Sequence, residues 1–120
     1  MIVKVTIHNN NDDTFLIANS KSKELLLKGN KLYVHTKHGA FIDGTELIEE
    51  FNTSEQCEMV YKKIKKFINR KREIKETINL TIKDIKMSNT EDEREIFKSF
   101  LWNRERELLK YDDLYIKDIK

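Results

Sequence analysis

The chain contains no proline, three glycines and a single cysteine among its 120 residues. One cysteine cannot form an intramolecular disulfide, and a cysteine-based metal site requires several thiolates. Three separated glycines exclude the usual glycine-rich loop that holds a phosphate. Cys57 lies within a helical apolar pattern, so we expect a buried and unreactive thiol. Without a disulfide or a cysteine-based metal site, the fold must be stabilised by hydrophobic packing.

Long apolar runs are also missing. No stretch approaches the roughly 20 residues of a membrane helix, and the alternating N-terminus has no signal-peptide core. We therefore expect a cytoplasmic protein. Heavy use of lysine, isoleucine and asparagine indicates AT-rich codons, and hence a low-GC bacterium or one of its phages or mobile elements. For a phage protein the compartment would be the host cytoplasm.

Charge is abundant but nearly balanced. Charged residues make up 37% of the chain, with 23 basic against 21 acidic residues and a net charge of +2. The global charge thus says little about partners, and an electrostatic binding signal must be local. The length is that of one domain with a core of its own, so residues 1–120 are predicted to form a single domain.

The N-terminal half carries strand and turn signals. Apolar residues alternate over residues 2–8, which is the period of a half-buried strand. The polar cluster at residues 9–13 predicts a turn into a second strand at 14–18. Gly29-Asn30 and Asp43-Gly44 predict two further hairpin turns. We expect an antiparallel β-meander of about five short strands.

The apolar period then changes to three and four residues. Thr53 and Gln56 have the spacing of a capping box, with Asn52 and Glu55 as a rival register. The residues at the helical spacing form one apolar face: Cys57, Val60, Tyr61, Ile64, Phe67 and Ile68. Alternation over residues 77–82 predicts a further strand.

A second capping box begins the C-terminal part. Thr90 and Glu93 predict the start of a second helix, and residues 114–120 either extend that helix or form a last short strand. The apolar face of this helix is assigned to Ile96, Phe97, Phe100, Leu101, Leu108 and Tyr111. The predicted fold class is α+β: the N-terminal meander, one long amphipathic helix, a further strand and a second C-terminal helix.

Catalytic motifs are weak throughout. The serines lack a nucleophile-elbow sequence, and neighbouring carboxylates diverge on a strand or helix. His35, His38 and Asp43 could hold a metal or a small ligand only if their loop folded back, and their spacing matches no known ligand set. We therefore predict no enzyme, no cofactor and no metal site, with a small hydrolase or ligand pocket at these three residues as the remaining alternative.

The strongest local charge lies between Lys62 and Lys75, where eight basic residues face one acid, for a local net charge of +7. The apolar helical face excludes these side chains, so we expect them on the opposite, solvated face, which could neutralise phosphates or an acidic protein surface. A merely solvated lysine-rich face is the alternative. The candidate basic-face residues are Lys62, Lys63, Lys66, Arg70 and Arg72.

Trp102 and Leu109 lie outside the apolar sector of the second helix, seven residues apart. They either widen the buried face or form an exposed patch next to Arg106, the aromatic-plus-arginine combination enriched in interface hot spots. The leading interpretation is a small non-enzymatic protein-binding regulator or inhibitor that acts on a host protein through Trp102, Leu109 and Arg106. A homodimer is another candidate, and a nucleic-acid-binding module using residues 62–75 is the alternative function.

Overall fold

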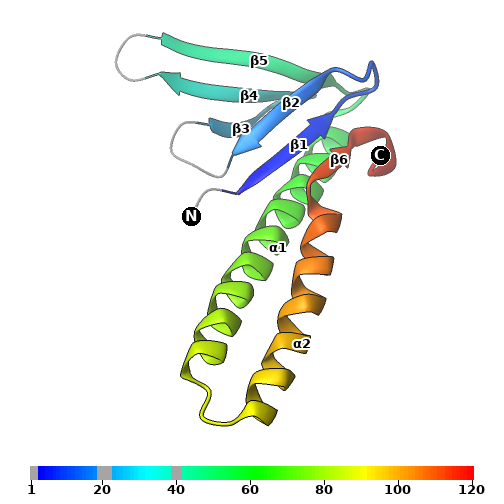
Figure 1. Ribbon diagram of the computed structural model, residues 1–120. Coiled ribbons are helices and arrows are strands. Elements are labelled where there is room, and N and C mark those ends of the chain that lie inside the picture. The colour runs from blue at the N-terminus through cyan, green and yellow to red at the C-terminus, as the bar shows by residue number, and fades with distance from the viewer. Residues whose placement is uncertain (1–2, 19–22, 39–41) are drawn as a thin grey trace.

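The computed structural model describes residues 3–18, 23–38 and 42–120. Within this part, five strands precede two long helices and a short last strand, and two single-turn 3₁₀ helices flank that strand (Figure 1). The predicted α+β class is confirmed. The elements are β1 (Lys4–His8), β2 (Thr14–Ala18), β3 (Lys23–Lys28), β4 (Lys31–His38), β5 (Ile42–Glu50), α1 (Ser54–Met87), α2 (Glu91–Leu108), η1 (Leu109–Tyr111), β6 (Asp113–Tyr115) and η2 (Ile116–Asp118).

The strands form two three-stranded sheets, with orders β2-β1-β6 and β3-β4-β5. β1 pairs antiparallel with β2, and it pairs parallel with β6 in a register that sets Ile7 opposite Leu114. The C-terminal segment therefore returns to the first strand. In the second sheet the predicted β3–β4 hairpin turns at Gly29, whose φ of 60° suits a residue without a Cβ.

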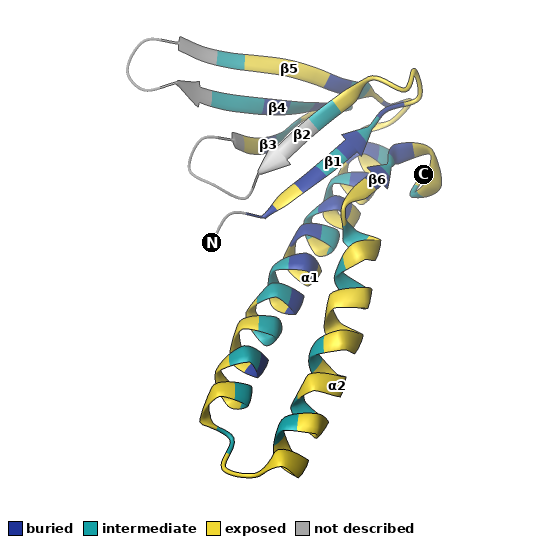
Figure 2. Cartoon of the chain, in the orientation of Figure 1, coloured by how far each residue is buried: buried dark blue, intermediate teal, exposed yellow. Residues whose placement is uncertain are grey.

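The core lies where the two sheets pack over the N-terminal half of α1. Val3, Val5 and Ile7 are fully buried, as the period-two pattern predicts. Figure 2 shows the buried positions gathered on β1, β6 and the upper part of α1. The other core residues are Leu25, Leu32, Val34, Ile48, Phe51, Cys57, Val60, Ile64, Ile68, Leu114 and Ile116.

α1 continues far beyond the sheets. Its 34 residues span about 51 Å at 1.5 Å per residue, close to the 57 Å longest dimension of the molecule. α2 runs back along α1, and we call the two-helix segment of residues 66–111 the arm (Figure 1). Along all of its described length α2 contains no buried residue, and Figure 2 shows the arm as largely exposed or intermediate. The arm is a single layer of two helices.

The strand predicted over residues 77–82 is wrong, because these residues belong to α1. Ile74, Ile78, Thr81 and Ile85 recur every three or four residues, and this helical spacing overrides the local alternation. Residues 114–120 do contribute a last strand, β6.

The turn predicted at Asp43-Gly44 is also wrong. β5 runs through both residues, which pair with Lys37 and Thr36 of β4. The described ends of the two strands are His38 and Ile42, so the connection between them lies outside the described residues.

Both predicted helix starts are confirmed. The Thr53 hydroxyl accepts a hydrogen bond from the Gln56 amide at 3.1 Å, and the Thr90 hydroxyl accepts one from the Glu93 amide at 3.2 Å. Each cap satisfies an amide that the first helical turn leaves free. Among the helices of the described residues, none has the length and apolarity needed to cross a membrane.

Candidate partner-binding surface

Trp102, Arg106 and Leu109 form one row along the arm, which we call the outer row. Their spacings of four and three residues stack them on one side of α2 and the following turn η1. Trp102 is 59% exposed and Leu109 is 73% exposed. The Arg106 guanidinium lies 4.5 Å from the Trp102 ring centroid. Of the two sequence interpretations, the exposed patch is therefore the one that the structure shows.

The outer row faces outward because α2 packs on α1 through its opposite side. Phe97, Leu101, Leu108 and Tyr111 are half-buried against α1, and Trp102 lies about 140° around the helix from Phe97 at 100° per residue. Ring contact between Tyr111 and Phe67, at 4.8 Å between centroids, fixes the base of α2.

Beside the outer row the surface is hollowed. An open depression of about 410 Å³ is lined by Asn103, Arg106, Glu107, Leu109 and Lys110. It offers amide, guanidinium, carboxylate and ammonium groups around an apolar leucine. An exposed aromatic ring, a stacked arginine and an adjoining depression are the usual parts of a protein–protein anchor site.

A second exposed row lies where the sequence pattern predicted a buried face. Ile96 and Phe100 were assigned to the buried face, yet they are 54% and 53% exposed. With Asn103 and Glu107 they form a row at spacings of four, three and four residues, which we call the flank row. The apolar positions assigned to α2 cover a sector of about 140°, wider than one partner helix covers. An apolar sector wider than one neighbouring helix can cover predicts that some of its residues stay exposed, as Ile96 and Phe100 of the flank row do.

α1 exposes apolar side chains in the same region. Leu80 is 60% exposed and Met87 is 79% exposed, both in the arm. Together with the outer and flank rows, they leave apolar surface on several sides of a segment that projects from the sheets (Figure 2).

The predicted basic face is divided and partly neutralised. Lys62 pairs with Glu58 at 3.1 Å, and the Lys63 ammonium donates to the Ile119 carbonyl oxygen at 3.1 Å. Lys66 is exposed and makes no ion pair with any described residue. Lys62 and Lys63 thus have partners within the chain, and Lys66 is exposed on its own. These three candidates do not form one continuous surface of unpaired cations.

Arg70 is held by two carboxylates. It donates to Glu107 at 2.8 Å and to Glu73 at 3.4 Å, and the Glu107 hydrogen bond is the main reason that the pKa of Arg70 is raised above its ordinary value. Because the guanidinium is charged at any physiological pH, the consequence is structural: the bridge joins α1 to α2 at the base of the arm.

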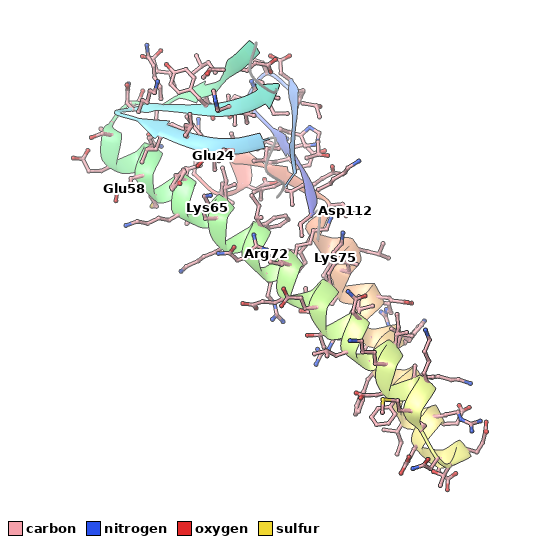
Figure 3. All side chains as sticks on the ribbon, turned by 90° about the vertical axis from the view of Figure 1, so that its left-hand side faces the viewer. Glu24, Glu58, Lys65, Arg72, Lys75 and Asp112 are labelled. Carbon is pink, nitrogen blue, oxygen red and sulfur yellow. The ribbon has the colours of Figure 1, made fainter. Side chains whose placement is uncertain are left out.

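Two basic side chains leave the predicted face altogether. Lys71 was expected to be solvated, and this expectation is wrong: it is 4% exposed and donates to the Lys4 carbonyl oxygen and to Asp112. Arg72 lies about 120° around α1 from Lys66 and is half-buried, and no described group accepts from its buried Nε. Figure 3 shows Arg72 and Lys65 on the flank of α1 below β3.

The described side chains do not support the alternative metal or ligand site at His35, His38 and Asp43. His35 contacts the Thr45 hydroxyl at 3.0 Å, whereas the side chains of His38 and Asp43 lie outside the described residues. In the described part, no group of three or more histidine, cysteine, aspartate or glutamate side chains is arranged to hold a metal ion. Cys57 is buried as predicted, and burial raises the pKa of its thiol.

The sequence did not predict the hydrogen-bonded polar cluster that lies at the β1–β2 turn. Asn9 is 8% exposed; its side chain donates to the Ile48 carbonyl oxygen and accepts from the amides of Asn11 and Asp13. Glu49 accepts from Asn10 and from Lys120. These bonds tie the β1–β2 turn and the C-terminus to β5, so the cluster serves the fold.

No protein-family model, curated protein or solved structure matches this chain.

Proposed function

We propose that this chain is a non-enzymatic regulator or inhibitor that binds another protein through the outer row of the arm. The observation that carries the proposal is the exposure of Trp102 and Leu109 with Arg106 stacked on the ring. The heavy use of lysine, isoleucine and asparagine, which AT-rich codons encode, supports an origin in a phage or mobile element of a low-GC bacterium, with a host protein as the partner.

The energetics favour an interface at this position. Trp102 leaves roughly 150 Å² of side chain in water if 59% of about 250 Å² is exposed, and covering it would contribute roughly 3–4 kcal/mol at 25 cal/mol per Å². Covering most of Leu109 would add about 1–2 kcal/mol. Two such anchors are on the scale of interface hot spots.

Arg106 adds specificity to the apolar anchors. Its guanidinium is already placed over the Trp102 ring, so less side-chain freedom is lost when a partner binds. The planar group still has donors for a carboxylate at the edge of the contact. The expected partner therefore presents an apolar pocket with an acidic rim.

Nucleic acid binding is the weaker alternative. Its basic segment contains one buried lysine, Lys71, and an arginine held by two glutamates, Arg70. Lys62 and Lys63 also have internal partners. Fewer cations are therefore free to neutralise phosphates than the local net charge of +7 suggests.

The test is affinity capture from a low-GC bacterial lysate, with and without nuclease, analysed by mass spectrometry. Wild-type protein, Trp102→Ala and the flank-row control Phe100→Ala serve as baits. We expect one stoichiometric protein that survives nuclease, is lost with Trp102→Ala and is retained with Phe100→Ala. Equal capture by all three baits would remove the outer row from the proposal.

The alternative function has its own variant. Reversing the exposed residues Lys62, Lys63 and Lys66 to glutamate should leave protein capture intact, and Arg70 is kept because it joins α1 to α2. Recovery dominated by nucleic acid, lost with nuclease and with this triple reversal, would transfer the function to the basic segment of α1.

A further inference from the structure

We infer that a second copy of this chain packs on the flank-row side of the arm, with the two arms antiparallel. The apolar anchors of the two surfaces are separate, because Phe100 and Trp102 lie about 160° apart around α2. Only the polar residues Asn103 and Glu107 border both, since they also line the depression beside the outer row. The inference therefore does not depend on the partner proposed for the outer row.

The arm is incomplete as a packing unit. A helix normally buries an apolar stripe against a second layer, and α2 has only α1 beneath it. Along the described length of α2 no residue is buried, and Ile96 and Phe100 remain more than half exposed. Two such helix pairs placed face to face would form a four-helix bundle.

The Arg70–Glu107 bridge fixes which residues of the two helices lie at the same height along the arm. Counting from this bridge, Phe100 of α2 lies level with Thr77 of α1. On the same side of α1, Lys66, Arg70, Thr77 and Asp84 follow one another at spacings of four and seven residues. Lys66 lies about 160° around α1 from the core residue Ile64, so the sheets do not cover this side.

The charges along this side of α1 are self-complementary. Lys66 lies toward the sheets, Thr77 in the middle and Asp84 toward the tip, while the Arg70 guanidinium is already shared between Glu73 on the same side and Glu107 of α2. A two-fold axis through the level of Thr77 and Phe100 would bring Asp84 of each copy to within one helical turn of Lys66 of the other. Lys66 and Asp84 make no ion pair with a described residue of their own chain.

The same axis would bring the two Phe100 rings together. The acidic first turn of α2 would then face Glu107, which Arg70 and Arg104 already neutralise. A parallel arrangement would instead set Asp84 against that first turn, with its three acids, and like charges would repel. The charge pattern therefore selects the antiparallel arrangement.

The available area is sufficient. The overlap from residue 66 to residue 88 is about 33 Å long at 1.5 Å per residue, and two adjacent helices are about 20 Å wide. Each copy would cover about 650 Å², for about 1,300 Å² in total. Stable interfaces bury roughly 1,200–2,000 Å² in total, so the arm can support a dimer near the lower end of that range.

Sedimentation equilibrium of the full chain tests the inference. We expect a monomer–dimer equilibrium that Phe100→Glu weakens by at least about 30-fold in Kd, because a hot-spot side chain is replaced at the centre of the interface. The matched outer-row variant Trp102→Glu should leave Kd within about threefold. Both positions are exposed, so circular dichroism should report an intact fold for each variant.

Charge reversal tests the pairing of the two ends. Asp84→Lys should raise Kd by roughly tenfold, since two attractive contacts per dimer become repulsive. Glu46→Lys makes the same change in net charge on the exposed edge of β5 and should have no effect.

Cysteine crosslinking tests the direction. A short bifunctional thiol reagent should join Thr77→Cys dimers, whose substituted residues meet at the axis. Asn89→Cys, at the tip, should not crosslink, because the two copies of residue 89 lie about 36 Å apart in the antiparallel arrangement. The buried Cys57 leaves the new cysteine as the accessible thiol.

Three results would overturn the inference: a wild-type chain that stays monomeric to near-millimolar concentration, a dimer unaffected by Phe100→Glu, or crosslinking at residue 89 in place of residue 77. None of them bears on capture of a partner by the outer row.

Discussion

Lys71 joins the arm to the sheets through its contact with Asp112. Substitution of these two residues should change the free energy of unfolding in a non-additive way, by amounts that follow from the structure. The Nζ atom of Lys71 donates to the Lys4 carbonyl oxygen at 2.7 Å and to the Asp112 carboxylate at 2.5 Å. The Thr6 amide donates to the Asp112 carbonyl oxygen at 2.8 Å. α1, β1 and the segment before β6 therefore meet at one buried ammonium group.

Asp112→Ala would leave that ammonium buried with a single carbonyl acceptor. Breaking a buried pair costs about 3–5 kcal/mol, but the Asp112 side chain is 59% exposed, so we expect about 2 kcal/mol. Lys71→Met keeps the alkyl stem and removes the charge, and should cost about 1–2 kcal/mol for the lost hydrogen bonds.

The double variant is the decisive one, because no charge is then left buried. It should be no less stable than Asp112→Ala alone, so the two single costs must not add. Equilibrium urea unfolding at pH 7, followed by far-ultraviolet circular dichroism, measures all three variants. Additive losses, or a loss below about 0.5 kcal/mol for both single variants, would refute the buried pair.

Other residues give shorter tests. Trp102→Ala should change the free energy of unfolding by less than about 1 kcal/mol, measured by urea unfolding; a larger loss would mean that Trp102 belongs to the core. Asn9→Ala should cost about 2–3 kcal/mol in the same assay, because three hydrogen bonds of a buried side chain are lost, including the one to Ile48. Burial raises the pKa of the Cys57 thiol above its ordinary 9.0, so its contribution is complete at neutral pH and stability should fall as pH rises beyond 9.0; pH-dependent unfolding of the wild type against Cys57→Ala checks the sign.

Local signals in the sequence predicted most of the elements. Thr53 and Thr90 act as helix caps, Gly29 permits its turn, and the alternation of Val3, Val5 and Ile7 marks a strand. Each feature depends on residues close in the chain, so it can be read without knowledge of the fold.

Long-range contacts explain what was missed. Parallel pairing of β1 with β6 joins the two ends of the chain, and no local pattern specifies it. Residues 77–82 became helical because α2 packs beside them, and Lys71 is buried because Lys4 and Asp112 supply acceptors from distant segments. For the candidate site, helical geometry correctly placed Trp102 outside the apolar sector of the second helix. Whether Trp102 widens the buried face or forms an exposed patch depends on how many helices pack against α2, and the local sequence does not give that number.

Trp102 is the only tryptophan of the chain, and its own signal tests the central claim that the outer row binds the partner. The measurement is the fluorine resonance of 5-fluorotryptophan incorporated into this chain alone, recorded with and without the captured partner. We expect a solvent-exposed resonance in the free chain that shifts and loses its solvent isotope effect on binding. A complex in which that resonance remains exposed and unchanged would contradict it.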